Sequence, residues 1–175
     1  MPEMTDKERF VSIFREKIKR EGSEDLLNFL LSESSDFFTA PASTRYHGAE
    51  AGGLCRHSLN VYDCLCDQLA RPRMKNLYGI HYSEESIAIS ALLHDLCKTT
   101  EMISDETGSV SDYSADGLLI GHLVRGVARI EEAAKNVGVS GEIVLLLEHM
   151  VLSHHSIPEY GSPKAPMFPE AAGLA

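Results

Sequence analysis

The amino-acid sequence predicts an all-α fold. Apolar residues recur at helical spacing along most of the chain, and residues suited to helix caps precede several of these segments. The chain has 175 residues and 43% hydrophobic content, which is enough for one sizeable core and too little for two comfortable domains. We therefore expect one structural domain, in which N-terminal helices within residues 1–45 pack on the main helical region of residues 46–175.

Two amphipathic helices are expected near the N-terminus. Thr5 and Glu8 have the spacing of a capping box, and the apolar residues that follow them fall on one helical face. Ser23 is suited to cap the second helix. Pro41 and three glycines then interrupt any period between residues 39 and 53, so this segment is expected to form a loop.

The next two helices carry polar residues in apolar surroundings. One begins near Gly53 and places His57 on the same stripe as core-type leucines and valines. The other follows a cap at Ser83, is apolar along its length, and ends in the adjacent His94 and Asp95. An imidazole and a carboxylate at the end of a buried helix indicate either a polar cap or half of a metal site.

The second half of the chain is also expected to be mainly helical. A polar stretch over residues 99–116 predicts a loop or a short hairpin. A long helix over residues 117–138 follows, and Ser140 can cap another over residues 141–155, after which closely spaced prolines forbid a regular helix. His122 follows Gly121 early in the first of these helices, and His154 and His155 end the second.

Charge and composition narrow the class of protein. Sixteen basic and 26 acidic residues give a net charge of −10, which disfavours a broad electrostatic surface for nucleic acid or anionic membranes. No apolar stretch approaches the roughly 18 to 20 residues that span a bilayer. The four cysteines lack CxxC spacing, which is typical of reduced thiols in a cytoplasmic protein.

The histidines point to a shared cation. A single histidine on an apolar face is usually a satisfied core residue, but several buried imidazoles each lose a few kcal/mol of solvation. A metal ion bound by several of them offsets that cost, and neutral imidazole suits iron, manganese, zinc, cobalt or nickel. Adding a carboxylate such as Asp95 supplies the negative charge that such an ion needs.

The order of these residues resembles that of the HD-domain metal-dependent phosphohydrolases. The phrases "GGLCRHSLNVYDCL", "ALLHDLCK", "GHLVRG" and "LSHHSIPEYGSPKAPMFPEA" look most like the HD half of bacterial 3′ to 5′ exoribonucleases. The resemblance covers roughly residues 46–174 and implies an HD-type helical bundle with one or two divalent transition metal ions. The metal ligands that it implies are His57, His94, Asp95, His122, His154 and His155.

The resemblance also implies a reaction. Asp95 would bridge two ions, and a metal-bound hydroxide would attack the phosphorus of a phosphomonoester or phosphodiester. Lys98 is the second expected catalytic residue, since it can reach a phosphate oxygen or Asp95, although a lysine also suits a helix C-terminus. Arg125 and His47 are the expected substrate-binding residues, and an ordinary exposed arginine is an equal alternative for Arg125.

Two departures from the family pattern leave an alternative open. Cys97 replaces a glycine that the family commonly has, and no aspartate follows His155, where the family has its last ligand. Only Glu159 and Glu170 are acidic there, and Pro169 with Glu170 predicts the first turn of a helix that is cut short. The alternative to an enzyme is a catalytically impaired HD module that binds nucleotide or metal as a regulatory domain.

The expected substrate is small. The acidic charge, together with the only about 45 residues that precede the HD-like region, favours a phosphate-containing substrate such as a nucleotide or short oligonucleotide over long nucleic acid. The sequence therefore predicts a cytoplasmic, metal-dependent phosphohydrolase that acts on such a substrate.

Overall fold

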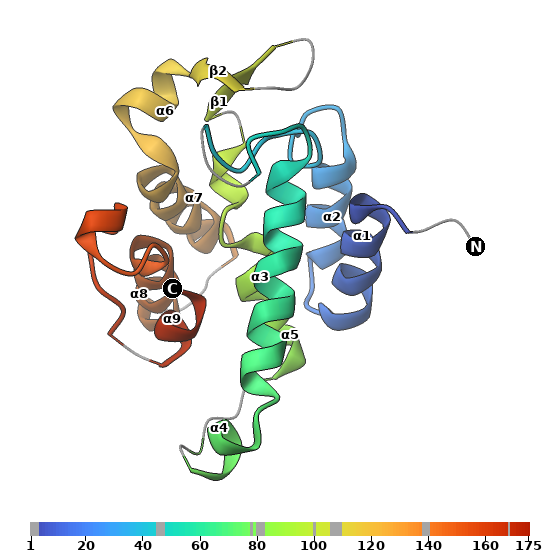
Figure 1. Cartoon of the computed structure of the whole chain (residues 1–175). Coiled ribbons are helices and arrows are strands. Elements are labelled where there is room, and N and C mark those ends of the chain that lie inside the picture. Colours follow the sequence, from blue (N-terminus) through green and yellow to red (C-terminus); the bar gives the residue numbers. More distant parts are fainter. Residues whose placement is uncertain are drawn as a thin grey trace. The chain divides into compact units, whose positions relative to one another are not determined.

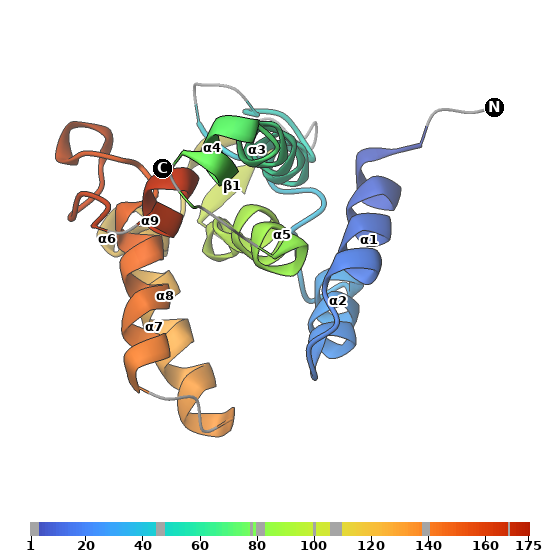
Figure 2. The same cartoon turned by 90° about the horizontal axis from the view of Figure 1, so that it is seen from below.

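The computed structural model describes residues 4–44, 48–77, 79, 83–99, 101–105, 110–137, 141–167 and 169–175. It is mostly helical, which confirms the all-α prediction (Figures 1 and 2). The chain forms two compact units, Met1–Leu118 and Leu119–Ala175, and each is described by itself. The division expected at residue 45 stays a prediction.

The first unit begins with two helices, α1 (Asp6–Lys17) and α2 (Ser23–Leu31). The capping box is confirmed, because the Thr5 hydroxyl accepts a hydrogen bond from the backbone N–H of Glu8 while the Glu8 carboxylate accepts one from that of Thr5. The cap predicted at Ser23 is wrong: Gly22 is the N-cap residue, in the left-handed region at φ +80°, and Ser23 is already helical.

Helix α3 (Gly53–Leu69) and helix α5 (Glu84–Leu93) form the centre of the first unit, with the short α4 (Pro72–Asn76) between them in the chain. Ser83 caps α5, because its hydroxyl accepts a hydrogen bond from the backbone N–H of Ser86. Both helices pack on α1 and on each other. The buried core that they share includes Phe10, Phe14, Leu27, Leu30, Phe37, Leu54, Leu59 and Leu92.

The loop between α2 and α3 folds back on itself. The backbone N–H of Ala42 donates to the carbonyl oxygen of Gly48, and that of Leu54 donates to the carbonyl oxygen of Ala40. Gly48 has φ +76°, and a Cβ atom at Gly53 would overlap the Gly48 carbonyl group. Glycine at these two positions therefore lets the loop close tightly over the start of α3.

A short hairpin follows α5 and the 3₁₀ turn Leu96–Lys98, as the sequence predicts for residues 99–116. Strands β1 (Met102–Ser104) and β2 (Val110–Tyr113) pair in antiparallel register. Met102 lies opposite Tyr113, and Ile103 lies opposite Asp112. These pairs place Met102 and Tyr113 on one face of the hairpin and Ile103 on the other.

Helix α6 (Ala115–Leu119) precedes α7 (Gly121–Val137) and α8 (Gly141–Ser153), which pack together in the second unit. The single helix predicted over residues 117–138 is wrong. Gly121 has φ +75°, a left-handed conformation that breaks the helical path and separates α6 from α7. The chain then ends in the 3₁₀ turn Pro158–Tyr160 and in α9 (Pro169–Leu174); the cap predicted at Ser140 lies outside the described residues.

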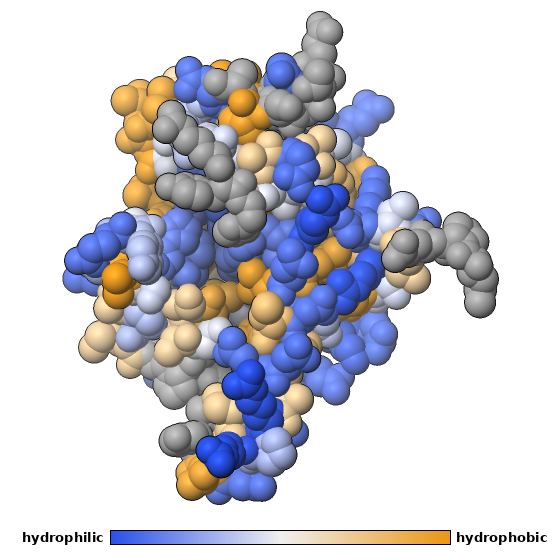
Figure 3. Space-filling view, viewed as in Figure 1, coloured by the Kyte–Doolittle hydropathy of each residue, from blue (hydrophilic) through white to orange (hydrophobic). Residues whose placement is uncertain are grey.

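The surface agrees with the charged composition. The face that carries α3 shows mainly hydrophilic side chains with scattered apolar ones (Figure 3). Within the part of the chain that the structure describes, no helix is both long and apolar enough to cross a bilayer.

Candidate metal centre

The end of α5 places an imidazole and a carboxylate in the interior of the first unit. His94 follows Leu93 as the C-cap residue, and Asp95 turns away from the helical path at φ −101° to begin the 3₁₀ turn. The His94 side chain is 4% exposed and that of Asp95 is 1% exposed. A buried carboxylate is costly unless cationic or hydrogen-bonding groups surround it, so the groups that face Asp95 define the site.

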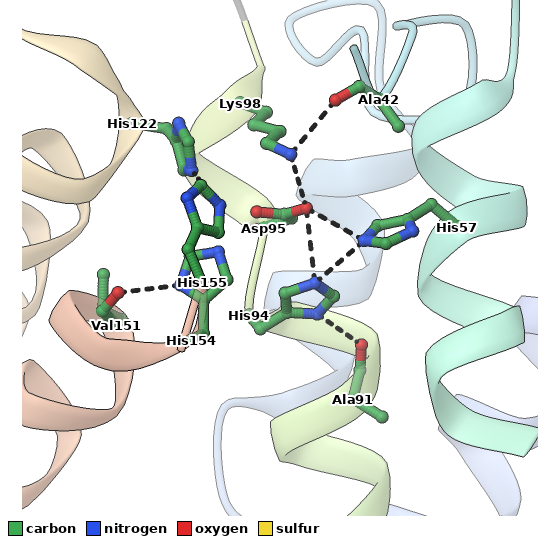
Figure 4. Close-up of polar contacts among 10 residues, drawn as sticks. All are labelled: Ala42, His57, Ala91, His94, Asp95, Lys98, His122, Val151, His154 and His155. Carbon is green, nitrogen blue, oxygen red and sulfur yellow. Dashed lines mark hydrogen bonds and ion pairs between the residues drawn. The ribbon is translucent and has the colours of Figure 1, made fainter. Parts of the chain in front are cut away.

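His57, from α3, completes a cluster around one carboxylate oxygen. The Nε2 atoms of His57 and His94 each lie 3.3 Å from Asp95 Oδ2 and 3.3 Å from each other (Figure 4). One potential ligand atom from each of the three residues lies within 4.8 Å of the other two. Two imidazole nitrogens and a carboxylate oxygen that converge in this way could hold a metal ion.

A backbone contact sets the orientation of His94. Its Nδ1 atom lies 2.9 Å from the carbonyl oxygen of Ala91, three residues earlier (Figure 4). Because a carbonyl oxygen only accepts hydrogen bonds, Nδ1 is the protonated nitrogen and Nε2 carries the free lone pair. This is the arrangement of metal-binding histidines, whose second ring nitrogen usually donates to a carbonyl or carboxylate group. Both the donor atoms, two nitrogens and one oxygen, and the tautomer of His94 therefore fit a transition metal.

Lys98 supplies the positive charge next to the carboxylate. Its Nζ atom lies 2.9 Å from Asp95 Oδ2 and 3.1 Å from the carbonyl oxygen of Ala42 (Figure 4). The side chain of Lys98 is only 13% exposed, so solvent screens this ion pair weakly. Of the two contacts expected for Lys98, the one with Asp95 is present.

The second unit carries a cluster of three histidines. His122 lies in the first turn of α7, and His154 and His155 directly follow α8. The Nε2 atoms of His122 and His155 are 3.3 Å apart, and the rings of His154 and His155 have centroids 4.2 Å apart (Figure 4). His154 repeats the contact of His94, since its Nδ1 atom lies 2.8 Å from the carbonyl oxygen of Val151.

A tight turn follows this cluster, which no residue pattern in the sequence predicts. The backbone N–H of Ile157 donates to the carbonyl oxygen of His155 across Ser156, which has φ +74°. This combination is a γ-turn of positive φ, a rare and strained conformation. Gly161, later in the same loop, has φ +101°, a left-handed conformation that favours glycine.

The residues predicted to bind substrate, the other histidines and Glu170 are placed as follows. Arg125 lies on α7 one turn after His122 and is exposed, which leaves both readings of its role open. His149 accepts a hydrogen bond from the backbone N–H of Met167 at 3.0 Å, a structural role. Glu170 lies in α9, where a helix was predicted to start. His47 and His81 lie outside the described residues.

Comparison with known proteins relates this chain to bacterial exoribonucleases. It is 39% identical over 136 residues to the 3'-5' exoribonuclease YhaM of a Geobacillus species, with 77% of this chain and 39% of the relative aligned. It is 36% identical over 137 residues to the protein of that name from Bacillus licheniformis, where 78% of this chain and 40% of the relative align. The protein of that name from Bacillus subtilis is 32% identical over 157 residues, which cover 89% of this chain and 46% of the relative.

The chain thus spans less than half the length of these curated relatives. No family model matches it, and no solved structure matches it.

These relatives correct the substrate expected from the sequence. The net charge of −10 predicts a small nucleotide substrate and disfavours long nucleic acid. This prediction is contradicted by the relatives, which are named for activity on RNA. A negative net charge does not exclude an RNA substrate, because it averages over a whole surface. Contacts to a nucleic acid depend instead on local basic groups and on any cation held beside them.

Proposed function

We propose that this chain is an HD-type metal-dependent phosphohydrolase that cleaves phosphodiester bonds of RNA. The observation that carries the proposal is the convergence of His57 Nε2, His94 Nε2 and Asp95 Oδ2, each pair 3.3 Å apart, around a nearly inaccessible carboxylate. The relatives named as 3'-5' exoribonucleases supply the substrate class and the direction of cleavage.

The residues of the first unit have complementary tasks in this proposal. His57 and His94 present neutral nitrogen ligands, and the carbonyl group of Ala91 keeps the His94 ring in the ligating tautomer. Asp95 provides the anionic ligand. A divalent ion held there would supply Lewis-acid stabilisation of the phosphodiester oxygens and would activate a water molecule.

Lys98 binds the substrate in the same proposal. Its ammonium group already lies 2.9 Å from Asp95 Oδ2, so a phosphate group brought to the ligands would meet it at hydrogen-bonding distance. Ammonium groups bind phosphate as point charges. We therefore assign Lys98 to the scissile phosphate. We assign Arg125, on α7, to a neighbouring phosphate of the RNA strand.

His122, His154 and His155 are proposed to hold a second ion. Three imidazoles with a short Nε2–Nε2 distance of 3.3 Å and a carbonyl-oriented His154 have the same ligand chemistry as the first cluster. The family resemblance further implies that Asp95 is also a ligand of that ion. The number of ions retained by an Asp95→Asn variant tests this implication directly.

The experiment that tests the function uses RNA of defined ends. The chain is incubated with manganese and a 5′-labelled single-stranded oligoribonucleotide, and products are resolved at single-nucleotide resolution. Stepwise shortening from the 3′ end is expected, together with a block when the 3′-terminal nucleotide is modified. Asp95→Asn should lower the rate by more than about 100-fold, because removing even outer partners of metal ligands costs 10- to 100-fold.

A matched control separates this loss from a general effect of the substitution. Asp67→Asn removes a carboxylate from the exposed surface of α3 and should leave the rate unchanged. Metal binding without any shortening of RNA or of generic phosphodiesters would overturn the proposal and favour the regulatory alternative.

A further inference from the structure

We propose that Tyr113 is a base-stacking residue for single-stranded RNA, and that Thr44 holds its ring in place. This inference rests on the proposed function and extends it from the phosphate to the base. It arises from the hairpin and the α2–α3 loop, neither of which supplies a ligand to the metal centre.

Tyr113 lies on the side of the hairpin that contacts the α2–α3 loop. Tyr113 lies opposite Met102 in the antiparallel register, so the two side chains share a face. The Tyr113 hydroxyl lies 3.4 Å from the hydroxyl of Thr44, from the loop before α3. One edge of the ring is therefore anchored, while 36% of the residue is open to solvent.

A short series of contacts connects Tyr113 with the metal centre, entirely within the first unit. Thr44 is two residues from Ala42, whose carbonyl oxygen accepts a hydrogen bond from Lys98 Nζ, and the same Nζ atom contacts Asp95 Oδ2. Two residues span at most about 7 Å of chain. A nucleotide whose phosphate reached Lys98 would thus have its base within reach of the Tyr113 ring.

The chemistry of single-stranded RNA suits such a residue. Unpaired bases stack on aromatic side chains, and this contact tolerates any base because every base has a π-face. Tyr113 is not among the residues of the buried core. An exposed aromatic ring, linked through Thr44 and Ala42 to the lysine proposed to bind phosphate, offers a contact for the base as well as one for the phosphate. Tyr113 would then give affinity for RNA without sequence preference.

The test compares base-dependent and base-independent readouts. Equilibrium binding of a labelled single-stranded oligoribonucleotide, and of an abasic oligomer of equal length, is measured without catalysis for wild type and for Tyr113→Ala. Affinity for the oligoribonucleotide should fall roughly 5- to 100-fold in the variant, the range found when a stacking aromatic is replaced by alanine. Affinity for the abasic oligomer should change less than about twofold.

Two variants control the interpretation. Tyr113→Phe keeps the ring and loses only the contact of its hydroxyl group with Thr44, so its affinity should lie between those of wild type and Tyr113→Ala. A role limited to the hydroxyl group would make it bind as weakly as Tyr113→Ala. Ile103→Ala removes a side chain that is 50% exposed on the opposite face of the same hairpin, and it should bind RNA like wild type. Thermal unfolding of each variant checks that the hairpin still folds.

Shortening of the abasic oligomer, which has no aromatic base, separates this inference from the proposed function. Tyr113→Ala should shorten this oligomer at the wild-type rate. Unchanged RNA binding in Tyr113→Ala would overturn the inference and leave the proposed function standing. Weakened RNA binding without hydrolysis of either substrate by wild type would support the inference and overturn the proposed function; a wild-type chain that does not bind the oligoribonucleotide would overturn the inference.

Discussion

The Nδ1 atom of His94 lies 2.9 Å from the carbonyl oxygen of Ala91, which is one of the last carbonyl groups of α5. His154 makes the same contact with Val151 at the end of α8, at 2.8 Å. In both cases a carbonyl group that has no partner inside the helix orients an imidazole. The C-terminal end of each helix thus orients the imidazole ring of a potential metal ligand.

This relationship predicts the tautomer of both histidines. In the metal-free protein, the neutral forms of His94 and His154 should carry the proton on Nδ1, since only this tautomer can donate to the carbonyl oxygen. Two-bond proton–nitrogen correlation spectra distinguish the two ring nitrogens. Spectra in which Nε2 is the protonated nitrogen would contradict the proposed ligand role, because the lone pair would then point at the backbone.

A second prediction concerns metal content. Protein purified or reconstituted with manganese, iron or zinc should carry a transition metal by elemental analysis, and acidification should release it because protons compete for the imidazole nitrogens. His57→Ala should lower the content, whereas His149→Ala, which removes only a contact with the Met167 backbone, should not. Equal content in wild type and His57→Ala would show that the ligand set is wrong.

A third prediction concerns Lys98 in the metal-free protein. Lys98→Gln should lower the free energy of unfolding by roughly 3 kcal/mol, because it leaves the buried carboxylate of Asp95 without its nearest cation. Added manganese should recover most of this loss, since a divalent ion also neutralises the carboxylate. Denaturant unfolding with and without the metal measures both effects, and Lys75→Gln on the exposed surface of α4 should change neither.

The sequence predicted most of the first unit because local signals agreed there with tertiary packing. The capping box at Thr5 and the cap at Ser83 formed as expected. The break at Gly121 was missed because the apolar pattern continues through it, and one glycine inside a helical pattern is usually tolerated. The left-handed backbone conformation of Gly121 cannot be read from the spacing of apolar residues.

The residue types of the candidate metal centre were predictable from the sequence. The backbone carbonyl groups that orient its histidines were not. The order of histidines and Asp95 in the chain indicated the chemistry, and two helices bring His57 and His94 together. The carbonyl groups of Ala91 and Val151 gave no signal, because any residue supplies a carbonyl group. Stacking by Tyr113 was not anticipated either, since only the folded hairpin turns that ring toward Thr44.

A fourth prediction concerns the closely packed loop over α3. Gly53→Ala should destabilise the protein by about 3 kcal/mol or more, because the new Cβ atom would overlap backbone atoms of Gly48 that cannot move away easily. Gly22→Ala is the control: its Cβ atom would meet nothing within 4 Å, although φ is +80°, so the loss should be only about 1 kcal/mol. Urea unfolding measures both, and equal losses would mean that the loop is looser than described.

The last prediction concerns the γ-turn after His155. Ser156 has φ +74° and is bridged by the hydrogen bond from Ile157 to His155, a conformation that costs a residue with a side chain about 1 kcal/mol relative to glycine. Ser156→Gly should therefore raise the free energy of unfolding by about that amount, and Ser156→Val should lower it because branching at Cβ worsens the clash. Ser12 lies within α1, so Ser12→Gly should lower the free energy of unfolding, since glycine weakens a helix interior.

Because the turn fixes the path of the chain beyond His155, Ser156→Val should also lower the metal content of the protein, whereas Ser12→Val should not. Destabilisation by Ser156→Gly would show that the serine side chain, and not the backbone conformation, is what the turn requires.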